Sequence, residues 1–120
     1  MDMCDDKRIV LCGANAYEQK YYFNEDFRAL PQSIQDELQI MCVMYTEEIG
    51  GILTLEFDED GELQFKVEAL DADAMFDEIG SVLRIKELQR SKQELLESLE
   101  LYYRVFFLGE DVDENSDGGE

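Results

Sequence analysis

The segment from Gly13 to Tyr22 gathers polar side chains of several kinds beside aromatic rings. A few polar groups next to apolar rings are typical of a ligand-binding pocket, so this segment is the first place to look for a site. The same residue types also form a turn followed by an edge strand, and this purely structural interpretation stays open. The candidate binding residues are Asn15, Tyr17, Glu18, Lys20 and Tyr22.

Catalytic chemistry is restricted by the absence of histidine from the sequence. Without histidine, a Ser-His-Asp triad and a histidine-ligated zinc site are excluded. Two carboxylates at a controlled distance can hydrolyse a glycosidic bond, but 30 acids produce neighbouring pairs such as Asp36-Glu37 and Glu47-Glu48 by chance. We therefore expect no catalytic residue and no cofactor. The alternative is an enzyme that uses its carboxylates with Mg²⁺ or Ca²⁺.

The three cysteines, Cys4, Cys12 and Cys42, are an odd number without a short paired spacing. This pattern predicts neither a disulfide framework nor a zinc knuckle, and we expect no metal site. Cys12 and Cys42 lie in apolar runs, as small core residues do. The acidic neighbours of Cys4 disfavour the thiolate that a nucleophile requires.

The net charge of −20 is distributed unevenly along the chain. Residues 1–35 sum to −2, 36–78 to −13, 79–104 to +1 and 105–120 to −6. A negative field repels DNA, RNA and anionic membranes, so we expect neither nucleic acids nor membranes as partners. The longest uncharged stretches have nine residues, whereas a membrane-spanning helix needs about twenty. Acids near the start replace the bases of a signal peptide, which predicts a cytoplasmic protein.

The first part of the chain carries strand patterns. An apolar run at 7–12 predicts a strand that ends in a turn at Gly13-Ala14-Asn15. The two-residue repeat of 17–24 predicts a second strand that pairs with the first. Asn24 is expected to cap a short helical turn that reaches Phe27.

The middle of the chain predicts a helix and a hairpin. Apolar residues recur at helical spacing over 31–48, and Gly50-Gly51 is expected to end this helix. Strands at 53–57 and 63–67 alternate strongly and enclose a four-residue loop at 58–61. The expected inward residues of the helix are Ile34, Leu38, Met41 and Tyr45.

Residues 72–108 return to a helical pattern that is too long for one small domain. An unbroken helix over these 37 residues would measure about 55 Å, whereas a domain of this size is about 35 Å across. Either the helix breaks near Arg90, where residues 91–94 have the form of a capping box, or it overhangs and buries its apolar stripe against a second copy. For 101–108, a strand is an alternative to a helix.

Together these elements predict an α+β fold of two layers: an antiparallel sheet of about four strands in β-β-α-β-β-α order, with helices on one face and a long or broken C-terminal helix. The expected single domain covers residues 7–109. Residues 1–6 are expected to be a disordered N-terminus, and 110–120 an acidic disordered tail.

Large aromatic residues and an arginine stand near the end of this expected domain. Protein interfaces are enriched in these residue types, although an intramolecular core explains them equally well. The candidate interface residues are Leu99, Tyr102, Tyr103, Arg104, Phe106 and Phe107.

Four stretches of the sequence, 9–15, 17–24, 30–43 and 100–109, resemble an uncharacterised family of small bacterial proteins from clostridial relatives. The resemblance covers residues 7–109. It implies a bacterial cytoplasmic protein and supplies no activity, ligand or catalytic residue.

The surplus of apolar helix and the lack of a coherent catalytic set lead to one main hypothesis. The chain is expected to be a non-enzymatic protein-interaction domain, homodimeric through its C-terminal helical region, with a protein partner that the sequence does not identify. The alternative is an acidic chaperone or nucleic-acid mimic that binds a cationic protein on residues 36–78.

Overall fold

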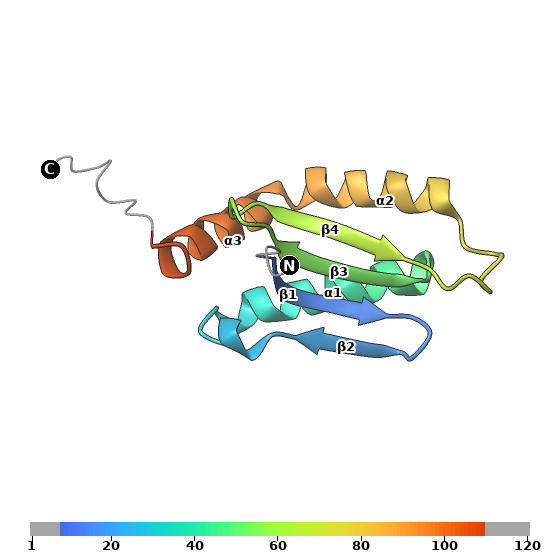
Figure 1. Ribbon diagram of the computed structural model, residues 1–120, viewed down its shortest axis with the longest axis horizontal. Helices are drawn as coiled ribbons and strands as arrows, with labels where there is room; N and C mark the ends of the chain where they lie inside the picture. Colours follow the sequence, from blue (N-terminus) through green and yellow to red (C-terminus); the bar gives the residue numbers. More distant parts are fainter. Residues whose placement is uncertain (1–7, 110–120) are drawn as a thin grey trace, which may run out of the picture.

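Alternating apolar and polar residues build a four-stranded antiparallel sheet, seen face-on in Figure 1. The structure is a computed structural model that describes residues 8–109. The strands are β1 (Ile9–Asn15), β2 (Lys20–Phe23), β3 (Ile52–Phe57) and β4 (Leu63–Glu68), in the order β2-β1-β3-β4. The helices are the short η2 (Glu25–Phe27), α1 (Gln32–Glu48), α2 (Glu78–Ser91) and α3 (Gln93–Phe106). The predicted α+β fold, with a four-stranded antiparallel sheet and a helical C-terminal part, is confirmed.

One face of the sheet packs on α1, which lies behind it in Figure 1, and no helix covers the front face within the part of the chain that the structure describes. Leu53, Leu55 and Phe57 alternate along β3 and are fully buried, as are Leu38 and Tyr45 of α1. Burying one such side chain contributes about 1.5–3 kcal/mol, so this layer contact is a main source of stability. The sheet has one face that packs on a helix and one that does not, because successive side chains of a strand point to opposite faces.

The predicted turn at 13–15 is wrong, because β1 continues to Asn15 and the chain turns at residues 16–19. Gly13 pairs with Tyr22 on one side and with Thr54 on the other. A Cβ at Gly13 would lie only 2.8 Å from the carbonyl oxygen of Leu53. The glycine therefore permits a close approach between β1 and β3, where the sequence pattern indicated a turn.

Several local predictions in the first two thirds of the chain are confirmed. Asn24 caps η2, since its side chain accepts a hydrogen bond from the amide of Asp26 at 2.9 Å. The helix predicted at 31–48 is α1, and the hairpin predicted around residues 58–61 joins β3 to β4. In these segments the signals are local, so the sequence pattern is sufficient.

The helix predicted from residue 72 begins later, at Glu78. Asp77 is its N-cap and accepts a hydrogen bond from the amide of Gly80 at 2.9 Å. Residues 69–77 form an irregular connection, in which Met75 is 89% exposed despite its helical spacing. The cap therefore decides where α2 begins.

Of the two alternatives for the C-terminal helix, the structure shows the break, which lies at Lys92, between α2 and α3. Lys92 has non-helical backbone angles, and its ammonium group contacts the carboxylate of Glu37 at 2.9 Å. No side chain caps α3, so the capping box does not form. α3 then runs as a helix to Phe106, which rules out the strand alternative for 101–108.

The predicted disordered ends, 1–6 and 110–120, lie outside the described residues. Within residues 8–109, none of the helices has the length and apolar character that crossing a bilayer requires.

Candidate functional site

A shallow pocket of about 390 Å³ lies on the helix-free face of the sheet, across β2, β1 and β3. Its apolar part is formed by Val10, Gly13 and Ile52. Val10 and Gly13 share this face because a β-bulge between Val10 and Cys12 shifts the register of β1 against β3. Tyr22, directly opposite Gly13 in the register, is 56% exposed. Four of the five predicted binding residues line this pocket: Asn15, Glu18, Lys20 and Tyr22.

Asn15 holds the β1–β2 turn through its side chain. The side-chain oxygen of Asn15, Oδ1, accepts hydrogen bonds from the backbone amides of Tyr17 at 2.9 Å and Glu18 at 3.2 Å. Gln19 completes the turn with a positive φ of 54°. The side-chain oxygen of Asn15 is thus occupied by the turn, which leaves Lys20, Glu18 and Tyr22 as the exposed groups at the pocket.

Tyr17, the fifth predicted binding residue, contacts the 69–77 connection. Its hydroxyl donates to the carboxylate of Asp73 at 2.6 Å and accepts from the amide of Leu70 at 3.1 Å. The hydrogen bond to Asp73 is the main cause that raises the pKa of Tyr17. Tyr17 therefore joins the β1–β2 turn to the segment that precedes α2.

The predicted interface residues divide between the core and the surface. Leu99 and Tyr103 are 2% and 3% exposed, so in this structure they belong to the core. The ring of Tyr103 stacks on that of Phe57 with centroids 4.2 Å apart, and Phe107 stacks on Phe27 at 4.7 Å. Tyr102 and Arg104 are half-buried, and Phe106 is 70% exposed. Only the end of α3 therefore presents predicted interface residues to solvent.

Exposed apolar side chains are concentrated on α2 and at the end of α3. α2 turns Ser81 and Leu88 inward and leaves a separate apolar stripe outside. A lone exposed leucine is ordinary on a protein surface, whereas a group of such residues indicates an interaction surface. The group at the start of α2 and the group at the end of α3 lie at opposite ends of the molecule in Figure 1, so they are two separate patches. The large exposed apolar residues of this region are Ile79, Val82, Leu83, Leu101, Phe106, Phe107 and Leu108.

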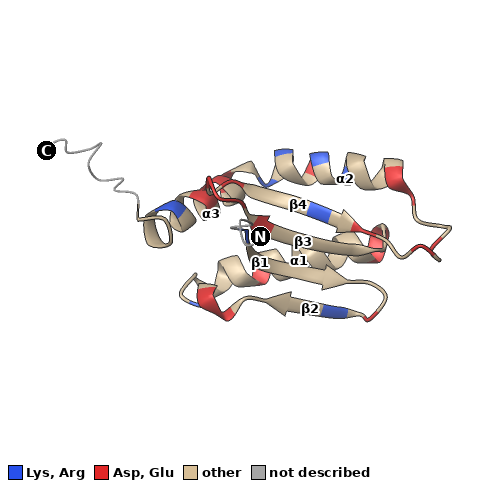
Figure 2. Ribbon diagram, viewed as in Figure 1, with Lys and Arg blue, Asp and Glu red and all other residues tan. Residues whose placement is uncertain are grey.

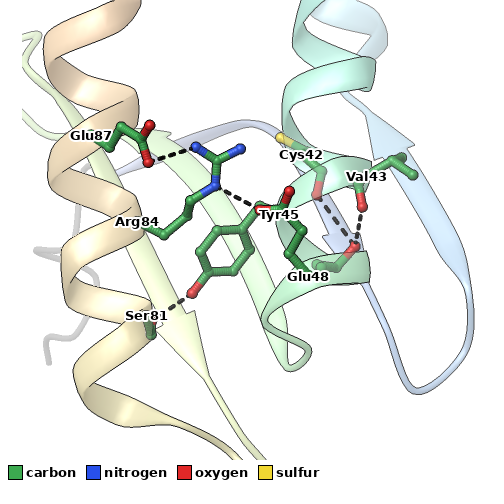
Figure 3. A network of polar contacts seen from close by, with 8 residues as sticks. Cys42, Val43, Tyr45, Glu48, Ser81, Arg84 and Glu87 are labelled. Atoms are coloured by element: carbon green, nitrogen blue, oxygen red, sulfur yellow. Dashed lines mark hydrogen bonds and ion pairs between the residues drawn. The ribbon is translucent and has the colours of Figure 1, made fainter.

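Polar contacts fix α2 beside α1, as Figure 3 shows. The hydroxyls of Tyr45 and Ser81 are 2.5 Å apart and buried. Arg84 contacts Glu48 of α1 at 2.8 Å and Glu87 of its own helix at 3.0 Å. Burial raises the pKa of Tyr45, although the hydrogen bond to Ser81 opposes this shift.

The two helices run antiparallel. The contact between Glu48 and Arg84 joins the end of α1 to the first half of α2, and that between Glu37 and Lys92 joins the start of α1 to the end of α2. Between the helices lies a groove of about 510 Å³, lined by Ile40 and Met44 among others. α1 and α2 thus form one continuous outer surface.

The acids of residues 36–78 do not form one strip. Those of the hairpin loop lie at one end of the sheet, and those of the 69–77 connection lie at the opposite end, because β4 separates them (Figures 1 and 2). The remaining acids of this segment are mostly on α1. Glu56, on the helix-free face, is 6% exposed and contacts Arg8 at 3.0 Å.

No group of three or more cysteine, aspartate or glutamate side chains is placed to hold a metal ion within residues 8–109. Cys12 and Cys42 are both fully buried, which confirms that they are core residues. Their sulfur atoms are 3.9 Å apart, as in a hydrogen bond between thiols.

The outer surface of α1 and α2 contains residues that the sequence analysis missed. Ile40 and Met44 lie on the side of α1 opposite its buried stripe and are 58% and 47% exposed. One feature of the sequence could have indicated this surface, because four of the ten basic residues fall within 84–92.

The chain matches a family described as "Family of unknown function (DUF6145)" over residues 8–111. This agrees with the expected resemblance to an uncharacterised family, and the match gives no organism. No curated protein and no solved structure matches the chain.

Proposed function

Since the chain belongs to this family of unknown function, its role has to be inferred from its surfaces, and we propose a non-enzymatic protein-interaction domain that self-associates through its C-terminal helices. The observation that carries the proposal is the set of exposed apolar residues on α2, to which a separate exposed apolar group at the end of α3 adds. Ile79, Leu83 and Phe106 are 75%, 62% and 70% exposed. Removing such a surface from water stabilises a complex by about 25 cal/mol per Å² of apolar area.

The distribution of exposed polar groups supports the same proposal. The pocket on the helix-free face has a largely apolar floor, and at its rim Asn15 is already bonded to its own turn. Tyr45 and Tyr103 owe their raised pKa mainly to burial, as core residues do. These groups serve the fold, whereas exposed side chains of α2 such as Ile79 and Leu83 lie outside the core cluster.

Sedimentation equilibrium and light scattering on the purified chain test the proposal. We expect a species with twice the 13.9 kDa mass of one chain. The triple variant Ile79→Ser, Leu83→Ser, Phe106→Ser is expected to be monomeric. Its control is Tyr22→Ser, which removes an exposed aromatic residue from the helix-free face and should leave the mass unchanged. A wild-type chain that stays monomeric up to the highest soluble concentration contradicts the proposal.

A further inference from the structure

The outer surface of α1 and α2 combines apolar residues with opposite charges on its two helices. On α1, Asp36 accompanies Ile40 and Met44, and on α2, Lys86 and Arg90 accompany Leu83. All six side chains are exposed. We call this set the helix-pair surface.

The basic residues of the helix-pair surface are available to a partner. Arg84 and Lys92, their neighbours on the inner side, are already paired with Glu48 and Glu37. Lys86 and Arg90 make no ion pair within 4.0 Å among the residues that the structure describes, and neither does Asp36. These free cations are unusual in a chain of net charge −20, because acids outnumber bases three to one.

We propose that a second copy of the chain binds the helix-pair surface, so that α1 of each copy packs on α2 of the other. This inference rests on the proposed function, to which it adds the surface and the orientation. A two-fold axis parallel to the helices brings the acidic α1 of one copy to the basic α2 of the other. An axis across the helices would instead place α1 on α1, with acids facing acids, which is unfavourable.

The contacts within one chain fix which residues meet. Glu37 and Lys92 are paired, so Asp36 and Arg90 lie near the same end of the helix pair. Rotation about an axis parallel to the helices preserves position along them, and Asp36 of each copy therefore meets Arg90 of the other. In the same way Met44, next to Tyr45, meets Leu83, which lies between Ser81 and Arg84.

Single substitutions on exposed positions test this arrangement by sedimentation equilibrium. Leu83→Ser and Arg90→Glu are each expected to raise the dimer dissociation constant about tenfold or more, because a two-fold interface contains every contact twice. Asp36→Lys is expected to have the same effect as Arg90→Glu. The double variant Asp36→Lys, Arg90→Glu restores the charge pair in reverse and is expected to regain most of the affinity.

Two variants are matched controls. Lys66→Glu makes the same charge change as Arg90→Glu, but on the helix-free face of β4, and is expected to leave the dissociation constant nearly unchanged. Phe106→Ser removes an exposed apolar residue of α3 outside the helix-pair surface, and its dimer is expected to persist. Circular dichroism and thermal melting establish that each variant is folded, as expected for changes at exposed side chains.

The possible results separate this inference from the proposed function. A dimer that survives Leu83→Ser and Arg90→Glu but is lost in Phe106→Ser overturns the helix-pair arrangement and leaves self-association through the C-terminal helices intact. A double variant as weak as its single parents overturns the predicted contact between Asp36 and Arg90. A monomeric wild-type chain overturns both proposals.

Discussion

The buried thiol of Cys42 makes the stability of the fold depend on pH. It lies fully buried on α1 with its sulfur 3.9 Å from that of Cys12 on β1. The hydrogen bond with Cys12 and burial both raise the pKa of the Cys42 thiol. The folded state therefore keeps this proton at pH values where the unfolded chain, with a thiol pKa of about 8.5, has lost it. Its contribution to stability is fully present below about pH 8.5 and decreases as the pH rises above it.

We accordingly expect the free energy of unfolding to fall by about 1.4 kcal/mol for each pH unit above about 8.5, until the tyrosines of the unfolded chain begin to titrate near about pH 10. Urea unfolding of a Cys4→Ser chain at a series of pH values measures this slope. The control is the double variant Cys12→Ala, Cys42→Ala in the same background, which removes both members of the buried thiol pair and should lose the dependence in this range. An identical slope in both chains would show that the buried thiols are not its source.

Two consecutive glycines, Gly50 and Gly51, connect the end of α1 to the start of β3. Gly50 and Gly51 both have positive φ, 94° and 77°. A Cβ at Gly50 would meet no atom within 4 Å. At Gly51 it would lie 2.8 Å from the carbonyl oxygen of Glu68 and 2.8 Å from the ring of Phe76. The two glycines therefore share one backbone requirement and differ in their steric environment.

Alanine substitutions separate the two effects. Gly50→Ala is expected to cost about 1–2 kcal/mol, the penalty of the left-handed conformation alone. Gly51→Ala is expected to cost about 1–3 kcal/mol more, because β4 has to move away from the new methyl group. Urea unfolding of both variants gives the difference directly. Equal losses would mean that the close approach of Glu68 has no energetic weight.

Elements with local signals were predictable from the sequence. The alternation of Leu53, Leu55 and Phe57 is sufficient for β3, and the helical spacing of Leu38, Met41 and Tyr45 is sufficient for α1. The failures involve residues with two possible roles. A glycine in an apolar run serves either a turn or a close strand contact, and Gly13 serves the latter because of β3, which is distant in the sequence. Asp77 likewise acts as a cap only once the preceding segment is irregular.

The candidate surfaces were predictable to different degrees. The pocket on the helix-free face was partly predictable, because seven of its residues, four of them predicted binding residues, fall within the short segment 13–22 that turns back on itself. The helix-pair surface was not, because contacts such as Arg84 with Glu48 join residues 36 positions apart. The sequence shows the basic residues of 84–92, but it does not show that the acidic helix α1 packs beside them.

At the scale of the whole molecule, the net charge opposes the association that the apolar surface favours. Two approaching copies each carry −20, and this long-range repulsion acts over the Debye length of the solution. The charge pairs proposed for the helix-pair surface act only at contact. Salt therefore weakens the repulsion more than it weakens the buried apolar contact.

We expect the dimer dissociation constant to fall as the ionic strength rises from about 0.01 M to about 0.15 M, where the Debye length shrinks from about 30 Å to about 8 Å. Sedimentation equilibrium over a sodium chloride series measures this trend. The alternative of an acidic chaperone or mimic predicts the opposite dependence for a cationic peptide such as oligolysine, because opposite charges attract less strongly in salt. A dimer that dissociates as salt increases would mean that attraction between opposite charges, and not the apolar surface, holds the two copies together. The net charge argues against that result, because 30 acids outnumber 10 bases and two copies of the chain therefore repel each other at long range.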